Sequence, residues 1–128
     1  MSTDAVVDAL VRTSFEVMGT LTRIGAEHDL SLTQLRVLGI LRDRRARMTE
    51  LAAYLGLDKS TLSGLVDRAE KRGLLAREKN PDDRRVVDVF MTPAGSELAD
   101  RVYVEVRREL APLIDQFEVI RLLDRDPR

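Results

Sequence analysis

Apolar residues recur at every third or fourth position along much of the chain, which is the spacing of helices with one buried face. No proline interrupts this spacing in the segment 4–27, so we predict one long amphipathic helix there. Its apolar stripe consists of Val7, Val11, Phe15, Met18, Leu21 and Ile24. A second helix is predicted from Ser31, which has capping-box spacing with Gln34, to about Arg42. The basic segment 42–48 that follows is predicted to be a solvated loop.

Two closely spaced helices are predicted next. Thr49 is expected to cap a short helix that ends at Gly56, and Asp58 is expected to cap a second helix that runs to about Gly73. The second helix has one apolar stripe, formed by Leu62, Leu65, Val66 and Ala69. Because only about three residues separate the two helices, they should cross at a steep angle, as in a helix-turn-helix.

Beyond Gly73 the periodicity changes from that of a helix to that of a strand. Val87, Val89 and Met91 are apolar at alternate positions, as in a strand with one buried face. The turn residues "PDD" at 81–83 separate this segment from "LLAREKN" before it. We therefore predict a two-stranded hairpin, and a hairpin directly after a helix-turn-helix is a winged helix.

A final helix is predicted to begin at Pro93, with Thr92 as its cap, and to be kinked or broken at Pro112. Its apolar stripe and that of the first helix would leave a large apolar patch on a monomer of this size. We therefore expect the two stripes to pair across a two-fold axis. The residues predicted for this dimer interface are Val7, Val11, Phe15, Val106, Leu110, Leu113, Phe117 and Ile120.

The composition excludes several classes of protein. A chain of 128 residues with 44% apolar and 34% charged residues is typical of one soluble globular domain. It has no cysteine, which excludes disulfides and thiol-based sensing. Its apolar runs are too short to span a membrane, and because no signal peptide is recognisable we expect a cytoplasmic location. The net charge of −1 lacks the bulk basicity of a typical nucleic-acid binder.

Catalytic and metal sites are poorly represented. His28 is the only histidine, so a multi-histidine metal site is excluded. None of the serines lies in a nucleophile elbow, and no glycine-rich loop follows a predicted strand. We therefore predict no catalytic residues, no metal and no cofactor, and we expect the protein not to be an enzyme.

Three segments resemble the MarR family of transcription regulators in order and spacing: "LTQLRVLGIL", "LAAYLGLDKSTLSGLVDRAEKRGLLAR" and "DDRRVVDVFMTPAG". The resemblance implies a homodimer with interlocking terminal helices, a recognition helix in the major groove and a wing tip in the minor groove of double-stranded DNA. It also implies release by a small aromatic or phenolic ligand, as in many members. Asp83 and Arg85 match the family's D-x-R wing signature. Asn80 stands where aspartate is common, which should matter little in a turn.

The predicted DNA-contacting residues lie on the second helix of the helix-turn-helix and on the wing. Small residues on the face opposite the apolar stripe would admit that helix to a major groove. Arg85, held in an extended pose by Asp83, would enter a minor groove. The predicted contacts are Lys59, Ser60, Thr61, Ser63, Gly64, Arg68, Lys71, Asp83, Arg84 and Arg85. Asp67 does not fit beside phosphates, and its role stays open, with a pair to Lys71 as one explanation.

The resulting prediction is a mainly helical winged helix-turn-helix over 31–92, with a helical dimerisation region over 1–30 and 93–128, in one compact domain. As a homodimer it would bind a pseudo-palindromic operator and repress transcription. Two alternatives remain. One is a winged helix that binds protein, as an anti-repressor or adaptor. Such a protein would not need the arginines in "DDRR", so these residues disfavour it. A metal-sensing winged helix is disfavoured by the lack of cysteine and the single histidine.

Overall fold

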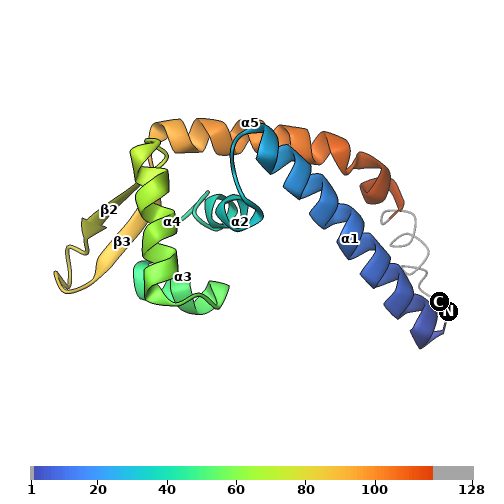
Figure 1. The fold of residues 1–128 in the computed structure, drawn as a ribbon, viewed down its shortest axis with the longest axis horizontal. Coiled ribbons are helices and arrows are strands. Elements are labelled where there is room, and N and C mark those ends of the chain that lie inside the picture. The colour runs from blue at the N-terminus through green and yellow to red at the C-terminus, as the bar shows by residue number, and fades with distance from the viewer. Residues whose placement is uncertain (1, 117–128) are drawn as a thin grey trace, which may run out of the picture. The chain divides into compact units, whose positions relative to one another are not determined.

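A computed structural model describes residues 2–116 (Figure 1). The fold is mainly helical with a small three-stranded antiparallel sheet, which confirms the predicted fold class. The elements in chain order are α1 (Thr3–Glu27), α2 (Leu32–Ile40), β1 (Ala46–Arg47), α3 (Met48–Leu55), α4 (Lys59–Lys71), β2 (Leu75–Lys79), β3 (Val87–Met91) and α5 (Pro93–Glu109). They form two compact units, one of Thr33–Arg101 and one of the residues up to Leu32 and from Val102 onward.

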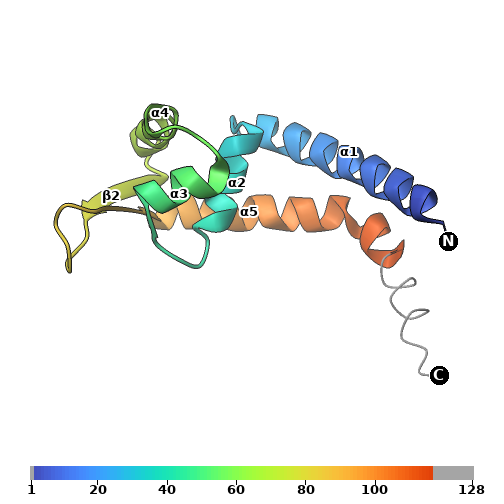
Figure 2. The ribbon, with the colours of Figure 1, turned by 90° about the horizontal axis from the view of Figure 1, so that it is seen from below.

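One of these units holds α1 and the part of α5 that follows Arg101. The side chain of Ser2 accepts a hydrogen bond from the backbone N–H of Ala5, and this cap begins α1. Beyond Val102, α5 runs beside α1 in the opposite direction (Figure 2). At the C-terminal end of α1, Nε2 of His28 lies 3.1 Å from Oε2 of Glu105 on α5. This contact ties the end of α1 to α5.

The final helix breaks where the sequence predicted. α5 ends at Glu109, a turn follows at Leu110, and residues 111–116 form another helical segment. Pro112 lies in the first turn of that segment, where its missing N–H leaves no helical hydrogen bond unmade. At the other end of α5 the expected cap is also confirmed, because Oγ1 of Thr92 accepts a hydrogen bond from the backbone N–H of Gly95.

The second unit holds the helix-turn-helix. Gly56 ends α3 in the left-handed conformation, with φ of 68°, and the backbone N–H of Leu57 donates to the carbonyl oxygen of Ala52. Asp58 then caps α4, as predicted. The buried side chains of α3 and α4 form the centre of this unit together with those of α2 and β3: Val37, Leu38, Leu51, Ala52, Leu62, Leu65, Val66, Ala69 and Val89. The four apolar residues predicted for the α4 stripe are all among them.

Three boundaries differ from the prediction. α2 ends at Ile40, two residues before Arg42. The segment 42–48 is not wholly a loop, because Ala46 and Arg47 form β1 and pair with β3. Thr49 is not the cap of α3, which begins at Met48 without a side-chain cap. The start of α3 depends on tertiary structure. Because the chain passes from β1 directly into the helix, the pairing of β1 with β3 decides where α3 begins.

The predicted two-stranded hairpin is part of a three-stranded sheet of order β1-β3-β2. The alternation of buried and exposed residues that was predicted for the second strand of the hairpin, now β3, is wrong. Val89 is buried, but Val87 is exposed, Met91 is only half-buried, and Asp88 on the opposite face of β3 is buried. β3 is the central strand, so both of its edges are paired, and the side chain of Asn80 folds back over Asp88.

Candidate nucleic-acid interface

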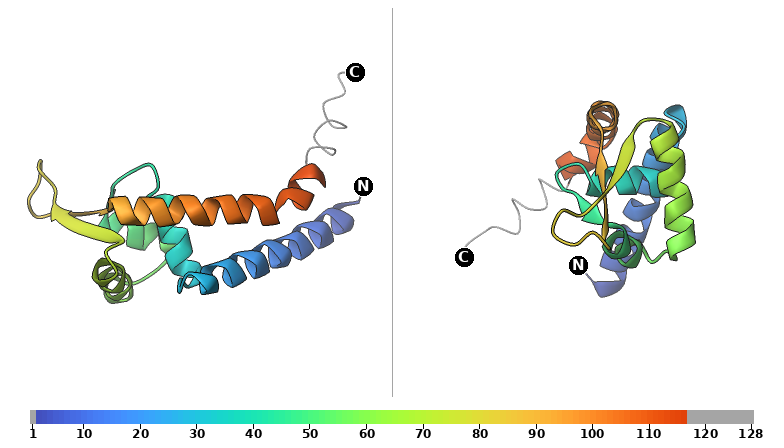
Figure 3. Two further views of the ribbon diagram at one scale, coloured as in Figure 1. Left: turned by 90° about the horizontal axis from the view of Figure 1, so that it is seen from above. Right: turned by 90° about the vertical axis from the view of Figure 1, so that its left-hand side faces the viewer.

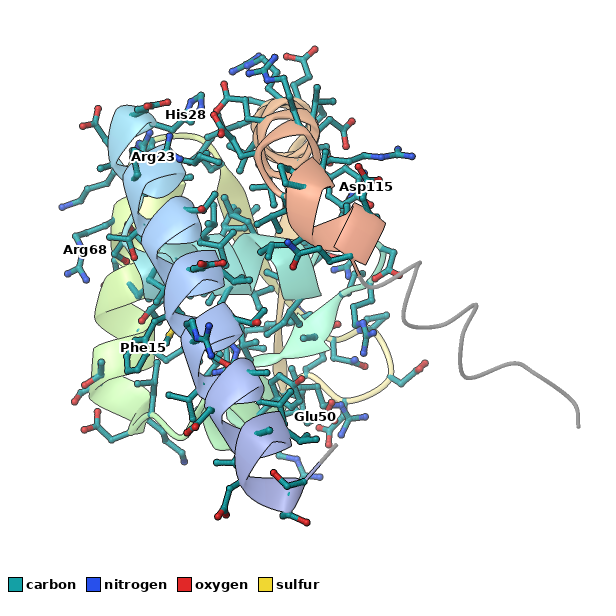
Figure 4. All side chains as sticks on the ribbon, turned by 90° about the vertical axis from the view of Figure 1, so that its right-hand side faces the viewer. Phe15, Arg23, His28, Glu50, Arg68 and Asp115 are labelled. Carbon is teal, nitrogen blue, oxygen red and sulfur yellow. The ribbon has the colours of Figure 1, made fainter. Side chains whose placement is uncertain are left out.

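The face of α4 opposite the buried stripe carries the residues predicted to contact DNA. Lys59, Ser60 and Thr61 in the first turn are exposed, and Ser63 and Gly64 are half-buried. Further along the helix, the exposed cations are Arg68 (labelled in Figure 4) and Lys71. The helix therefore has an apolar side that packs in the unit and a side of short polar residues and cations that is accessible.

The cap of α4 fixes the chemistry of its N-terminus. Oδ1 of Asp58 accepts hydrogen bonds from the backbone N–H of Thr61 at 2.7 Å and from the hydroxyl of Ser60 at 2.9 Å. These bonds hold the pKa of Asp58 below its usual value, so the cap is ionised at neutral pH. Because the Ser60 proton is directed at Asp58, its oxygen is left to accept a hydrogen bond from outside the helix.

Packing within the unit does not require a glycine at position 64. A Cβ at this position would meet only Nη1 of Arg68, at 3.5 Å, which is an ordinary contact distance. Gly64 lies inside α4, where glycine is less favourable than alanine by about 1 kcal/mol. The interior of the unit therefore does not explain this glycine, whereas close approach of another molecule to this face does.

Arg77 on β2 connects the sheet with α4, and it was not among the predicted site residues. Its guanidinium forms a close ion pair with Asp67, lies 2.6 Å from Oε1 of Glu70, and donates from Nη1 to Oγ of Ser63 at 3.4 Å. Oε1 of Glu70 is buried, and its contact with the guanidinium of Arg77 places a positive charge beside this carboxylate. The right-hand panel of Figure 3 shows α4 beside the hairpin that Arg77 joins to it.

Arg77 also explains the acidic residue that did not fit a DNA-binding face. Asp67 pairs with Arg77, and not with Lys71, which was one explanation that the sequence left open. The sequence contained a signal for this contact. Arg77 lies two residues after the buried Leu75 on β2, so both side chains are on the same, inward face of the strand. An arginine on that face needs a carboxylate partner. Arg77 offsets part of the negative charge of Asp67 and Glu70, and the cations Lys59, Arg68 and Lys71 lie on the accessible side of α4.

At the wing, the predicted contact between Asp83 and Arg85 is confirmed. Nε and Nη2 of Arg85 donate to the two carboxylate oxygens of Asp83 at 3.0 and 3.1 Å, and its backbone N–H donates to the same carboxylate. These bonds, first from the guanidinium and then from the backbone, lower the pKa of Asp83. The Arg85 side chain is nevertheless 90% exposed. It is thus a fixed and accessible cation, and Arg84 beside it is also exposed.

The predicted dimer interface is accessible where the structure describes it. Val7, Val11 and Phe15 on α1 are exposed, Phe15 (labelled in Figure 4) by 67%. Val6, Leu10 and Met18 on α1 are exposed as well. Of the predicted interface residues nearer the C-terminus, three are half-buried: Val106, Leu110 and Leu113. The other two, Phe117 and Ile120, lie outside the described residues. We call the exposed apolar residues of α1 the α1 surface.

None of the helices within residues 2–116 combines the length and the apolar composition that crossing a membrane requires. No group of three or more His, Cys, Asp or Glu side chains in this range is arranged to hold a metal ion.

Comparison with known proteins identifies the family. The sequence model of the MarR family matches residues 28–86, which include the helix-turn-helix, the first strand of the hairpin and its turn. PecS of Dickeya dadantii, an HTH-type transcriptional regulator, is 30% identical over 112 residues, which cover 82% of this chain and 68% of PecS. The chain belongs to the MarR family. The resemblance found in its three sequence segments is thereby confirmed, and the hairpin is the wing of a MarR winged helix.

Other proteins are similar to this chain over a shorter stretch or in fold. YkoM of Bacillus subtilis, an uncharacterised HTH-type transcriptional regulator, is 30% identical over 82 residues, or 63% of this chain. The chain spans only 53% of the length of YkoM, about half. Among solved structures, that of NadR in complex with 4-hydroxyphenylacetate superposes with a TM-score of 0.78 at 23% identity, covering 93% of this chain and 86% of NadR. This likeness concerns the fold.

Proposed function

We propose that this MarR family member is a sequence-specific DNA-binding repressor that acts as a homodimer on a pseudo-palindromic operator. α4 would lie in the major groove, with Ser60, Thr61, Ser63 and Gly64 facing the base edges. Lys59, Arg68 and Lys71 would contact phosphates, and Arg85 would enter the adjacent minor groove. Membership of a family of transcription regulators supports the general activity, and the geometry of α4 and the wing supports these roles.

The observation that carries the proposal is the accessible face of α4. A major groove is about 12 Å wide and admits a helix whose leading face is not bulky. The face of α4 meets this condition at Ser60, Ser63 and Gly64, and Gly64 has no role in packing. Arg77 offsets part of the negative charge of Asp67 and Glu70 at its flank, which reduces the repulsion that phosphates would meet there.

The homodimer is proposed from the α1 surface. Large apolar side chains on α1, among them Leu10 and Phe15, are exposed, and exposed apolar residues gathered on one element mark interaction sites. Pairing of this surface with that of a second copy would bury it. In such a dimer the two α4 helices would reach successive major grooves, roughly 34 Å apart.

Ligand release is proposed from a structural neighbour. NadR, which shares this fold, has been solved with 4-hydroxyphenylacetate, a phenolic acid. We propose that a small aromatic or phenolic compound lowers the affinity of this protein for its operator as well.

Selection of bound sequences from random duplex DNA tests the proposal as a whole. We expect enrichment of an inverted repeat whose half-site centres are about 10 base pairs apart, because two symmetric α4 helices would read equivalent sites one helical turn apart. Enrichment of a single unrepeated site would contradict the homodimer. A lack of any enrichment would contradict DNA recognition and would favour a winged helix that binds protein.

The wing gives a second prediction, for the duplex obtained by that selection. Arg85→Ala should lower affinity by about tenfold and weaken the preference for A/T pairs beside each half-site, because a narrow minor groove attracts an inserted guanidinium. Arg84→Ala should chiefly reduce the slope of log affinity against log salt by about one, as expected for a phosphate contact. Fluorescence titrations at several salt concentrations measure both effects.

The two arginine variants control each other, since they remove the same charge from adjacent positions. Equal losses that do not depend on sequence would mean that the wing only attracts phosphates. Unchanged binding by both variants would exclude the wing from the DNA interface.

A further inference from the structure

One carboxylate is buried in the sheet beneath the wing. Asp88, in the central strand β3, is only 6% exposed and is the one charged residue that is fully buried in the described part of the chain. Its neighbours across the sheet are Glu78 on β2 and Arg47 on β1. A buried carboxylate needs hydrogen-bond donors to offset the loss of water. The side-chain amide of Asn80 supplies them, with Nδ2 at 3.3 and 3.1 Å from the two oxygens of Asp88.

The rest of the Asn80 side chain and its backbone hold the wing turn. Oδ1 of Asn80 accepts hydrogen bonds from the backbone N–H groups of Asp82 and Asp83, at 2.8 and 3.2 Å. Its own N–H donates to the carbonyl oxygen of Val86 on the other side of the turn, at 2.8 Å. Asn80 therefore connects three parts of the wing: the buried strand, the start of the turn and its end.

Asp83, the residue that Asn80 holds by its backbone, in turn holds Arg85. A continuous chain of hydrogen bonds thus runs from the buried carboxylate of Asp88 through Asn80 and the backbone of Asp83 to the exposed guanidinium of Arg85. Its inner end is fixed in the central strand of the sheet. Its outer end is the cation at the tip of the wing.

We propose that Asn80 is a positioning residue for DNA recognition, which sets the direction of Arg85 by tying the wing turn to Asp88. The proposal rests on the proposed contact of Arg85 with DNA. It gives Asn80 a larger role than that of an ordinary turn residue. It also makes the amide essential: an aspartate at position 80 would keep the acceptor for the turn but would place a second carboxylate about 3 Å from that of Asp88.

Asn80→Asp and an exchange of the two side chains test this role. Asn80→Asp should lower affinity for the selected duplex by about tenfold, similar to Arg85→Ala, because the turn loses its tie to β3. The double variant Asn80→Asp/Asp88→Asn restores one amide and one carboxylate in contact, with the net charge unchanged. It should bind within about twofold of the original protein. If the exchange does not recover affinity, the proposed contact between the two side chains is not what positions the wing.

Two further variants separate positioning from other effects. Asn80→Asp/Asp82→Asn has the original net charge but keeps the two carboxylates together, so it should remain as weak as Asn80→Asp; recovery would mean that only charge matters. In an Arg85→Ala background, Asn80→Asp should cause no further loss, because Asn80 acts through Arg85. An equal further loss would show that Asn80 supports the unit in general, and would overturn the proposal.

Hydrogen exchange without DNA keeps this test independent of the proposed function. The backbone N–H of Val86 donates to the carbonyl oxygen of Asp83 and closes the turn. Its exchange should become faster in Asn80→Asp and return to the original rate in the exchanged variant. If Arg85→Ala leaves DNA affinity unchanged while this exchange pattern is found, the proposed wing contact fails but the link from Asn80 to Asp88 stands. Unchanged exchange in Asn80→Asp would overturn the link itself.

Discussion

Alanine at position 64 is expected to stabilise the protein and to weaken its binding to DNA. The free energy of unfolding should rise by about 0.5–1 kcal/mol, because alanine is the better helix former and the new methyl group meets no backbone atom. Affinity for the selected duplex should fall by about tenfold, because the same methyl group would separate α4 from the base edges. Gly64→Glu, which adds length and negative charge, should lower affinity by about a hundredfold or more. Thermal melting and DNA titration measure the two effects on the same samples.

Gly39 provides the matched control. It also lies inside a helix, α2, and a Cβ there would likewise meet nothing within 4 Å. Gly39→Ala should therefore raise stability by a similar amount, about 0.5–1 kcal/mol, without changing DNA affinity. If Gly64→Ala also binds DNA as tightly as the original protein, the face of α4 does not approach the duplex, and the proposed recognition helix is wrong.

Phe15→Asp is expected to separate the proposed dimer and thereby to lower DNA affinity by about a hundredfold or more. Phe15 is 67% exposed, so the change costs little in a monomer, but in the dimer it would bury a charge in an apolar interface. The affinity falls because two linked half-sites bind far more tightly than one. Sedimentation equilibrium at micromolar concentration and titration of the inverted repeat measure the two effects.

Tyr54 on α3 is the control for this change. It is an aromatic residue with the same exposure, 67%, and it lies outside the α1 surface. Tyr54→Asp should leave the dimer intact. A Phe15→Asp protein that is still dimeric would exclude the α1 surface as the interface, and an original protein that is monomeric at micromolar concentration would contradict the homodimer altogether.

Local sequence determined most of the helices and the contacts close to one another along the chain. The stripe of α4, the left-handed Gly56, the caps at Asp58 and Thr92 and the break at Pro112 were all predicted correctly. Each depends on groups within about one helical turn, so the spacing of the residues carries the information. The pair of Asp83 and Arg85 was predictable for the same reason, because two residues of one tight turn cannot lie far apart.

Tertiary structure alone decided the features that join distant segments. β1 exists because Ala46 and Arg47 find partners on β3, more than forty residues later in the chain, and this pairing also moved the start of α3 away from Thr49. Asp67 forms an ion pair with Arg77, and not with Lys71, because β2 packs against α4. Asn80 has a contact outside the turn, because its side-chain amide donates a hydrogen bond to Asp88, which is buried in the central strand. In each case a charged or polar group is stabilised by a partner that only the packing of separate elements brings within reach, and residue spacing does not identify that partner.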